Sequence, residues 1–321
     1  MTRAPLFGDG LCATVAEASL VSIQPTMSED DEVAPRPTLA QEVFIMPELY
    51  QGRNSVQHAL NTLDLRWLND GFREDDGRQQ YLDVGCASGC FTRDFLLEKC
   101  APCKRLVAVD ISHDMISYAR EHYSHPKITY EVLDIAGDVC GFTHRYGKFR
   151  RVYSFFALHW VKDQVGALRN IAALMTPDGE CLLKFVGRSP AFEVWLQLAR
   201  RQRWSSCAKI LTESVPNSHY AEDQRTYIEM LLRQTRLRPH TCEALRQEIS
   251  LSVDRMREMF SALLPVSKGM SPSEKEDMLD DFVSAMVTIC GGESKEAVAI
   301  QEIHYLVHAS KCSDLLQPVQ F

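Results

Sequence analysis

Five short apolar runs alternate with more polar segments along the middle of the chain. The runs cover residues 81–84, 106–110, 128–133, 151–156 and 181–186. Short apolar runs bounded by turn-forming residues are typical of buried strands, whereas the segments 90–100, 114–122 and 163–174 have helical periodicity. Strands joined by helices, or by loops of crossover length, imply a parallel sheet with helices on both faces. The pattern therefore predicts an α/β fold.

The residues on either side of this block predict further elements. Before it, four apolar residues recur at helical spacing: Val56, Leu60, Leu63 and Trp67. After it, residues 192–199 predict a helix, and residues 241–253 and 298–309 predict strands. The sequence at 271–274 is typical of a capping box with proline at the first helical position. The helix that follows presents a stripe of Met and Phe, for which we expect core packing, with the adaptable wall of an apolar pocket as the alternative.

A loop of small residues follows the first predicted strand. It places Gly85, Ala87 and Gly89 at alternate positions, with Asp83 just before them. Such a turn between a strand and a helix lets the backbone approach a ligand closely. The dinucleotide fingerprint G-x-G-x-x-G is not matched, and the added carboxylate suits a cationic ligand better than a pyrophosphate. A plain buried strand and turn is the alternative interpretation.

Acidic residues recur at the ends of the predicted strands. Asp83 lies near the end of the first strand, Asp110 ends the second, and Asp134 follows the third. The carboxyl ends of parallel strands share one edge of the sheet, where ligands bind, and an acid there can hold both hydroxyls of a ribose. One such acid alone would be expected to cap a helix or face solvent. Three in register with the glycine loop predict a nucleotide-like ligand.

The loop resembles motif I of the class I methyltransferases, usually written D/E-x-G-x-G-x-G. Gly85, Ala87 and Gly89 stand at the three glycine places, and Ala87 departs from the pattern, because its methyl group crowds the ligand if the residue needs a positive φ. The resemblance implies S-adenosylmethionine as the cofactor, with Asp110 at the ribose hydroxyls and Asp134 at the adenine amino group. It implies further cofactor contacts at Asp83, Ile111, Ile135 and Ser154.

Composition narrows the class of protein further. The chain has 321 residues, a net charge of −8 and scattered basic residues, so no nucleic-acid surface is indicated. Eleven cysteines without regular spacing favour reduced thiols and a cytoplasmic location, and the lone Cys100-x-x-Cys103 pair does not predict a metal site. No apolar run approaches the roughly 20 residues that a membrane-spanning helix needs. We therefore expect no nucleic-acid partner, no membrane span and no metal.

The chain divides into three predicted regions. Residues 1–44 include an acidic run and closely spaced prolines, which are typical of a flexible tail. Residues 45–190 form the predicted Rossmann-like core, which binds the cofactor and includes an N-terminal helix. Residues 191–312 form a predicted helical lid or substrate region, together with the final strands of the sheet.

Residues 153–164, 180–183 and 188–194 resemble the arthropod juvenile hormone acid O-methyltransferases. The similarity spans about residues 47–311 and is weaker in the C-terminal third, where the substrate is chosen. This family transfers the sulfonium methyl group to the carboxylate of a farnesyl-derived acid. The resemblance implies that Gln57 and Trp160 hold that carboxylate. Phe156 and His159 are implied pocket residues, although His159 could equally be a satisfied core histidine.

The chemistry of the acceptor supports these roles independently. A carboxylic acid has a pKa of about 4 and is already an anion at neutral pH, so methyl transfer needs orientation and exclusion of water rather than a base. Indole and amide N–H groups can hold one oxygen without neutralising the nucleophile. We therefore expect an enzyme that methylates an apolar small acid, of unknown oligomeric state. Two alternatives stay open: a methyltransferase of this fold acting on an aconitate-like or acyl-chain carboxylate, an amine or a hydroxyl, and a non-catalytic cofactor-binding relative.

Overall fold

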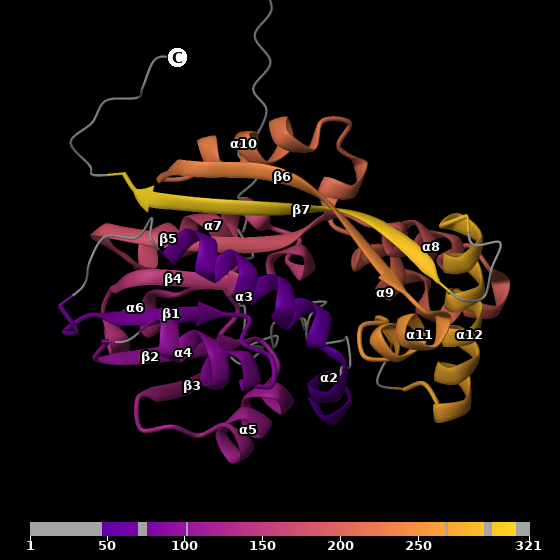
Figure 1. The fold of residues 1–321 in the computed structure, drawn as a ribbon, viewed down its shortest axis with the longest axis horizontal. Coiled ribbons are helices and arrows are strands. Elements are labelled where there is room, and N and C mark those ends of the chain that lie inside the picture. Colours follow the sequence, from indigo (N-terminus) through magenta and orange to yellow (C-terminus); the bar gives the residue numbers. More distant parts are fainter. Residues whose placement is uncertain (1–46, 70–75, 101, 267–268, 292–296, 313–321) are drawn as a thin grey trace, which may run out of the picture. The chain divides into compact units, whose positions relative to one another are not determined.

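The centre of the fold is a seven-stranded sheet with the strand order β3-β2-β1-β4-β5-β7-β6 (Figure 1). The computed structural model describes residues 47–69, 76–100, 102–266, 269–291 and 297–312. β1 to β5 run parallel, whereas β7 lies antiparallel between β5 and β6. The strands are β1 (Gln80–Val84), β2 (Arg105–Asp110), β3 (Ile128–Val132), β4 (Phe149–Phe155), β5 (Met175–Arg188), β6 (Leu237–Leu251) and β7 (Val298–Lys311). The predicted α/β architecture is confirmed, and the strand order reverses between β1 and β4, which is where open α/β sheets bind ligands.

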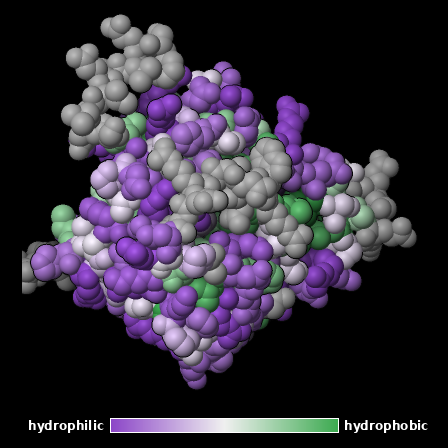
Figure 2. Space-filling view, turned by 60° about the vertical axis from the view of Figure 1, so that its left-hand side comes forward, coloured by the Kyte–Doolittle hydropathy of each residue, from purple (hydrophilic) through white to green (hydrophobic). Residues whose placement is uncertain are grey.

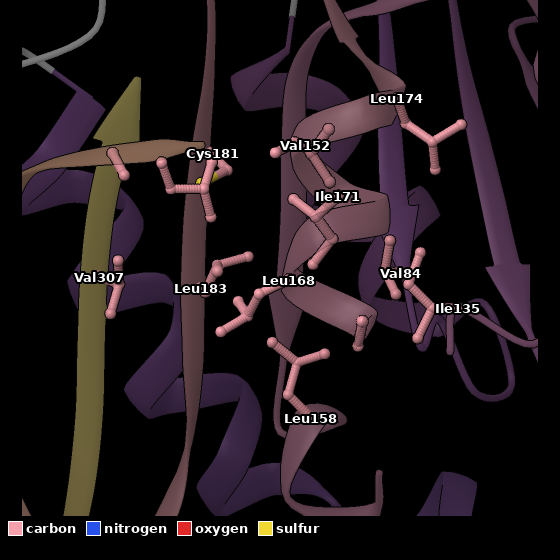
Figure 3. Close-up of a cluster of buried hydrophobic side chains, with 14 of the residues drawn as sticks. Val84, Ile135, Val152, Leu158, Leu168, Ile171, Leu174, Cys181, Leu183 and Val307 are labelled. Carbon is pink, nitrogen blue, oxygen red and sulfur yellow. The ribbon is translucent and has the colours of Figure 1, made fainter. Parts of the chain in front are cut away.

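Helices cover both faces of this sheet. One face carries α6 (Cys140–Tyr146), α7 (Gln164–Leu174) and α10 (Gln224–Arg233). Figure 3 shows Leu168 and Ile171 of α7 beside the strand residues Val152 and Leu183, with Val307 on the next strand, and all five are buried. The apolar stripe of α7 therefore holds this helix against the sheet.

The opposite face carries the elements that approach the glycine loop. These are α3 (Ser55–Asn69), a π-helical turn (Thr92–Leu96) that continues into α4 (Leu97–Lys99), and α5 (His113–His122). Leu65 of α3 packs with Tyr81 and Phe91 in one buried cluster. The prediction for α3 was wrong in detail, because Leu63 is 61% exposed. α2 (Pro47–Arg53) precedes α3 and is joined to it at Asn54.

A third group of helices has a core of its own. It contains α8 (Pro190–Ala199), α9 (Ala208–Glu213), α11 (Val253–Ser261) and α12 (Pro272–Ile289), and β6 and β7 extend toward it (Figure 1). Met278, Phe282 and Met286 of α12 are buried among Trp195 and Phe260. The expectation that the Met-rich stripe is core is therefore confirmed.

Some expectations differ from the structure. The helix predicted over 90–100 contains a π-helical turn, and α6, α9, α10 and α11 were not predicted; all four are ten residues or shorter. Trp204, which lies outside the predicted elements, is 4% exposed, and its indole donates a hydrogen bond to Asp281 Oδ2 over 2.8 Å. The tail predicted for residues 1–44 lies outside the described residues. The predicted boundary near residue 190, between the cofactor-binding core and the lid or substrate region, stays a prediction.

The surface view shows how the apolar residues are distributed. In Figure 2 the visible face is largely hydrophilic, and hydrophobic residues appear there only in small groups. Within the described ranges, no helix is both long and apolar enough to cross a membrane.

Replacing Ser271 by Ala should destabilise the protein by about 1 kcal/mol, because an N-cap hydroxyl satisfies a backbone N–H that would otherwise have no partner. The Ser271 hydroxyl accepts from Glu274 N, and the Glu274 carboxylate accepts from Ser271 N over 2.8 Å. Chemical denaturation measures the effect. Ser273→Ala is the control, because Ser273 is the second residue of the same helix and makes no capping hydrogen bond. Equal stabilities of the two variants would contradict the capping box.

Candidate functional site

A cavity of about 720 Å³ lies at the carboxyl ends of β1, β2, β3 and β4. Its position follows from the reversal of strand order between β1 and β4. Nine of the residues singled out from the sequence line it: Gln57, Gly85, Ala87, Asp110, Ile111, Asp134, Ile135, Phe156 and Trp160. These nine residues come from five separate segments of the chain and are brought together at one site.

The glycine loop bends through three left-handed residues. Gly85, Ala87 and Gly89 have φ values of 79°, 46° and 79°. Ala87 therefore adopts the positive φ at which its methyl group was expected to crowd a ligand. A Cβ atom at Gly85 would lie 2.1 Å from the Cβ of Ala157, so this position has no room for a side chain.

Asp110 fixes the loop from the neighbouring strand. Its Oδ2 accepts a hydrogen bond from Ala87 N over 2.9 Å, and its Oδ1 accepts one from Ser112 N over the same distance. Burial raises the pKa of Asp110, and these backbone donors oppose the rise. The carboxylate thereby joins the loops after β1 and β2 while it lines the cavity.

Asp134 lines the cavity farther along the same edge. Its Oδ1 accepts from Ala136 N over 2.9 Å. A carboxylate has acceptor sites left after one such bond, so Asp134 can also accept from an amino group of a ligand. The ribose hydroxyls and the amino group of an adenosine donate hydrogen bonds, and carboxylates are suitable acceptors for them, so the residues present fit that group.

Three predicted cofactor residues do not line the large cavity. Asp83 is 3% exposed, accepts from Thr92 Oγ1 over 2.7 Å, and lines a separate space of about 20 Å³. Ser154 is buried and its hydroxyl donates to Val84 O over 2.9 Å, which ties β4 to the end of β1. Gly89 packs against Tyr130, whose ring a Cβ atom would strike. In this structure Ser154 and Gly89 support the shape of the loop.

The two predicted acceptor residues come from different elements of the fold. Gln57 belongs to α3, and Trp160 ends a 3-10 turn (Leu158–Trp160) that follows β4. Both also line a second cavity of about 60 Å³, as does Phe156. Phe156 has a φ of 52°, a strained conformation for a bulky residue, and its N–H donates to Lys184 O over 2.7 Å. Gln57, Trp160 and Phe156 thus form the wall that the two cavities share.

The second cavity is mostly apolar, with a histidine pair beside it. Its lining includes Phe192, Trp195 and Phe260 from the third helical group, together with His159 and His304. Burial, followed by the nearby His304, lowers the pKa of His159 to about 3, so His159 is neutral at physiological pH. The structure places His159 at the pocket, as one of the two sequence interpretations expected.

Two supporting interactions were not predicted. The buried Lys184 of β5 forms an ion pair with Asp64 of α3, and its Nζ lies 5.5 Å from the centre of the Phe156 ring. The hydroxyl of Tyr50 donates to Oε1 of Gln57 over 3.1 Å. Asp64 lies 120 positions from Lys184, so no local pattern could pair them. Both interactions hold the helix that carries Gln57.

Replacing Asp83 by Asn should change how stability depends on pH. Burial raises the pKa of Asp83 from 3.8 to about 7, so the folded protein keeps a proton over a range where the unfolded chain has released it. Stability from this group is therefore lost as the pH rises from about 4 to about 7, by up to about 1.4 kcal/mol per pH unit. Denaturation of both proteins at pH 5 and pH 7 measures this loss. The free energy of unfolding of Asp83→Asn, relative to that of the wild type, should be larger at pH 7 than at pH 5. The same difference between the two proteins at both pH values would show that Asp83 does not titrate in this range.

Comparisons with known proteins agree with this geometry. A family profile described as "Methyltransferase domain" matches residues 82–183, which run from β1 into β5. The juvenile hormone acid O-methyltransferase of Drosophila melanogaster is 31% identical over 250 residues, which is 75% of this chain and 82% of the fly protein. The protein of the same name from Bombyx mori is 28% identical over 272 residues, or 79% of this chain and 92% of the silkworm protein.

A solved structure supports the fold independently. A Bacillus halodurans C-125 protein, described as a candidate methyltransferase, superposes with a TM-score of 0.50 at 17% identity, covering 78% of this chain and 99% of its own. The profile match and the fly relative together establish the family. The chain belongs to the juvenile hormone acid O-methyltransferases and is an S-adenosylmethionine-dependent methyltransferase.

Proposed function

We propose that this protein methylates the carboxylate of an apolar acid that resembles juvenile hormone acid or farnesoic acid. The names of the fly and silkworm relatives support this substrate class. The observation that carries the proposal is the shared wall of the two cavities. Gln57 and Trp160 lie on it, between the carboxylates that suit an adenosine and a pocket lined by aromatic side chains.

The cofactor half of the cavity fits S-adenosylmethionine. Asp110 would hold the ribose hydroxyls and Asp134 the adenine amino group, with Ile111 and Ile135 beside them on the cavity wall. A Cβ atom at Gly85 would strike the side chain of Ala157, which explains why a glycine lines the cavity at this position. When bound, the cofactor supplies an electrophilic methyl group. Cofactor contacts by individual residues stay a prediction.

The acceptor half needs to orient an anion and exclude water. The carboxylate of the acid is ionised at neutral pH, so no residue has to remove a proton from it. The amide N–H of Gln57 and the indole N–H of Trp160 are neutral donors that would hold it in line without quenching its charge. Burial lowers the pKa of His159 to about 3, so this histidine is a weak base and is not assigned that role. Stacking of Trp160 on Trp195, with 5.7 Å between ring centroids, keeps the indole in place.

The lining of the two cavities argues against a polyanionic acceptor such as aconitate. Among the described residues, Lys162 is the lysine that faces either space, and neither lining contains an arginine. The amino group of Lys162 donates to Val215 O over 2.7 Å, so it is already engaged. Several free cations would be needed to hold two or three carboxylates. An acid with one carboxylate and an apolar tail fits better.

The direct test is incubation of the wild type with labelled S-adenosylmethionine and a panel of acids. Farnesoic-type acids should accept the label, whereas straight-chain fatty acids and aconitate should accept less. Absence of transfer to every isoprenoid acid would contradict the proposed function. A cytoplasmic setting for the reaction stays a prediction from the cysteine pattern.

Replacing Trp160 by Phe should lower turnover with the acid by about 100-fold, because the N–H donor is lost while most of the ring is kept. Cofactor affinity, measured by calorimetry, should barely change. Trp204→Phe is the matched control, since it removes an indole N–H that donates to Asp281, away from both cavities. Full activity of both Trp160→Phe and Gln57→Ala would show that the carboxylate is held elsewhere.

Replacing Ala87 by Gly should tighten cofactor binding, by less than about tenfold. Ala87 has a φ of 46°, which glycine adopts without steric cost, and its methyl group lines the cavity. Calorimetric titration with S-adenosylhomocysteine measures the change. Weaker binding by the glycine variant would mean that the Ala87 methyl contributes a favourable contact.

A further inference from the structure

Two adjacent residues of α2 reach the two halves of the site. Tyr50 donates its hydroxyl hydrogen to Oε1 of Gln57 over 3.1 Å. Gln51, the next residue, accepts at its Oε1 from the hydroxyl of Ser88 over 3.1 Å. Ser88 belongs to the glycine loop, so α2 connects that loop with the amide proposed to hold the substrate.

The bond from Tyr50 selects one end of the Gln57 amide. A glutamine side chain has a carbonyl oxygen that accepts and an NH₂ group that donates, and only the NH₂ group can hold a carboxylate. A freely rotating amide would present its carbonyl oxygen, which repels an anion, for part of the time. Because the carbonyl of Gln57 accepts from Tyr50, its NH₂ group is left for the acceptor.

The surroundings of Tyr50 keep its hydroxyl group protonated, so that it can donate a hydrogen bond. Tyr50 lines both the large cavity and the small space that contains Asp83. Burial, followed by the negative charge of Asp110, raises the pKa of Tyr50 above its ordinary value. The phenol therefore stays protonated at every pH at which the protein works, and its hydrogen stays directed at a partner.

We propose that Tyr50 is a positioning residue that directs the NH₂ group of Gln57 at the substrate carboxylate. This inference rests on the proposed function, because it takes Gln57 as the residue that holds the acid. Tyr50 itself need not touch the reacting atoms. The link through Gln51 and Ser88 means that the glycine loop, which faces the cofactor, and the amide, which faces the acid, share one support.

A double-mutant cycle tests this role. Tyr50→Phe keeps the ring and removes the hydroxyl, so kcat with the acid should fall about tenfold, while the Kd for S-adenosylhomocysteine should change less than about threefold. In a Gln57→Ala background the same substitution should have no further effect, because the amide it orients is gone. Tyr227→Phe is the matched control, since Tyr227 also donates to a glutamine, Gln164, over 3.0 Å, but lines neither cavity. It should keep full kcat.

A second readout does not depend on activity. In protein labelled with ¹⁵N at glutamine side chains, Gln57→Ala identifies the Gln57 NH₂ signals, which should shift and broaden in Tyr50→Phe. The inference would be overturned if the loss of kcat in the double variant equalled the product of the losses in Tyr50→Phe and Gln57→Ala. If the wild type methylates no acid, the proposed function fails, and unchanged Gln57 signals in Tyr50→Phe would then overturn the positioning role separately.

Discussion

The carboxylate of Asp110 is the contact on which the cofactor side of the site depends. It accepts hydrogen bonds from Ala87 N and Ser112 N, so it closes the loop after β1 onto the loop after β2. The loop has left-handed residues at alternate positions, and the backbone N–H groups of Gly85 and Cys86 donate to Val109 O, so the bonds to Asp110 extend the attachment of the loop to β2. Asp110 holds the part of the loop at Ala87, which lines the cavity. Asp110 therefore helps to form the cofactor side of the cavity at the carboxyl ends of the strands.

The acceptor side is assembled from parts that are far apart in the chain. Gln57 lies on α3, and the buried ion pair between Asp64 and Lys184 holds this helix against β5. A buried cation that lost its partner would cost several kcal/mol, so α3 is not free to leave the sheet at this point. Lys184 also lies against the ring of Phe156, the strained residue at the end of β4. One buried side chain thus contacts both α3, which carries Gln57, and Phe156, which lies on the same shared wall.

Much of the cofactor half could be predicted from the sequence, because it depends on local patterns. Apolar runs fixed the strand ends, and the strand ends placed Asp110 and Asp134 at one edge. Asp83 was placed there too, but side chains alternate along β1, and this acid falls on the face of Tyr81, where it is buried against Thr92. The signal that could have separated it from the other two acids was its position, because Asp83 lies inside β1, whereas Asp110 ends β2 and Asp134 follows β3.

The acceptor half could be predicted only through family resemblance. Nothing in the residues around Gln57 or Trp160 indicates that they meet, since α3 and the turn after β4 come together through the packing of the whole sheet. The roles of Tyr50 and Lys184 depend on partners chosen by tertiary structure, and His304 reaches the pocket only because β7 inserts between β5 and β6. Interactions of this kind have no signature in a local sequence window.

The most direct measurement is a crystal structure of the protein with S-adenosylhomocysteine and a farnesoic-type acid bound together. The account predicts the adenosine between Asp110 and Asp134, and the acid's carboxylate within hydrogen-bond distance of Gln57 Nε2 and Trp160 Nε1, with one oxygen facing the sulfur. A carboxylate bound away from both side chains, or an acid whose tail occupies the space between Asp110 and Asp134, would contradict it.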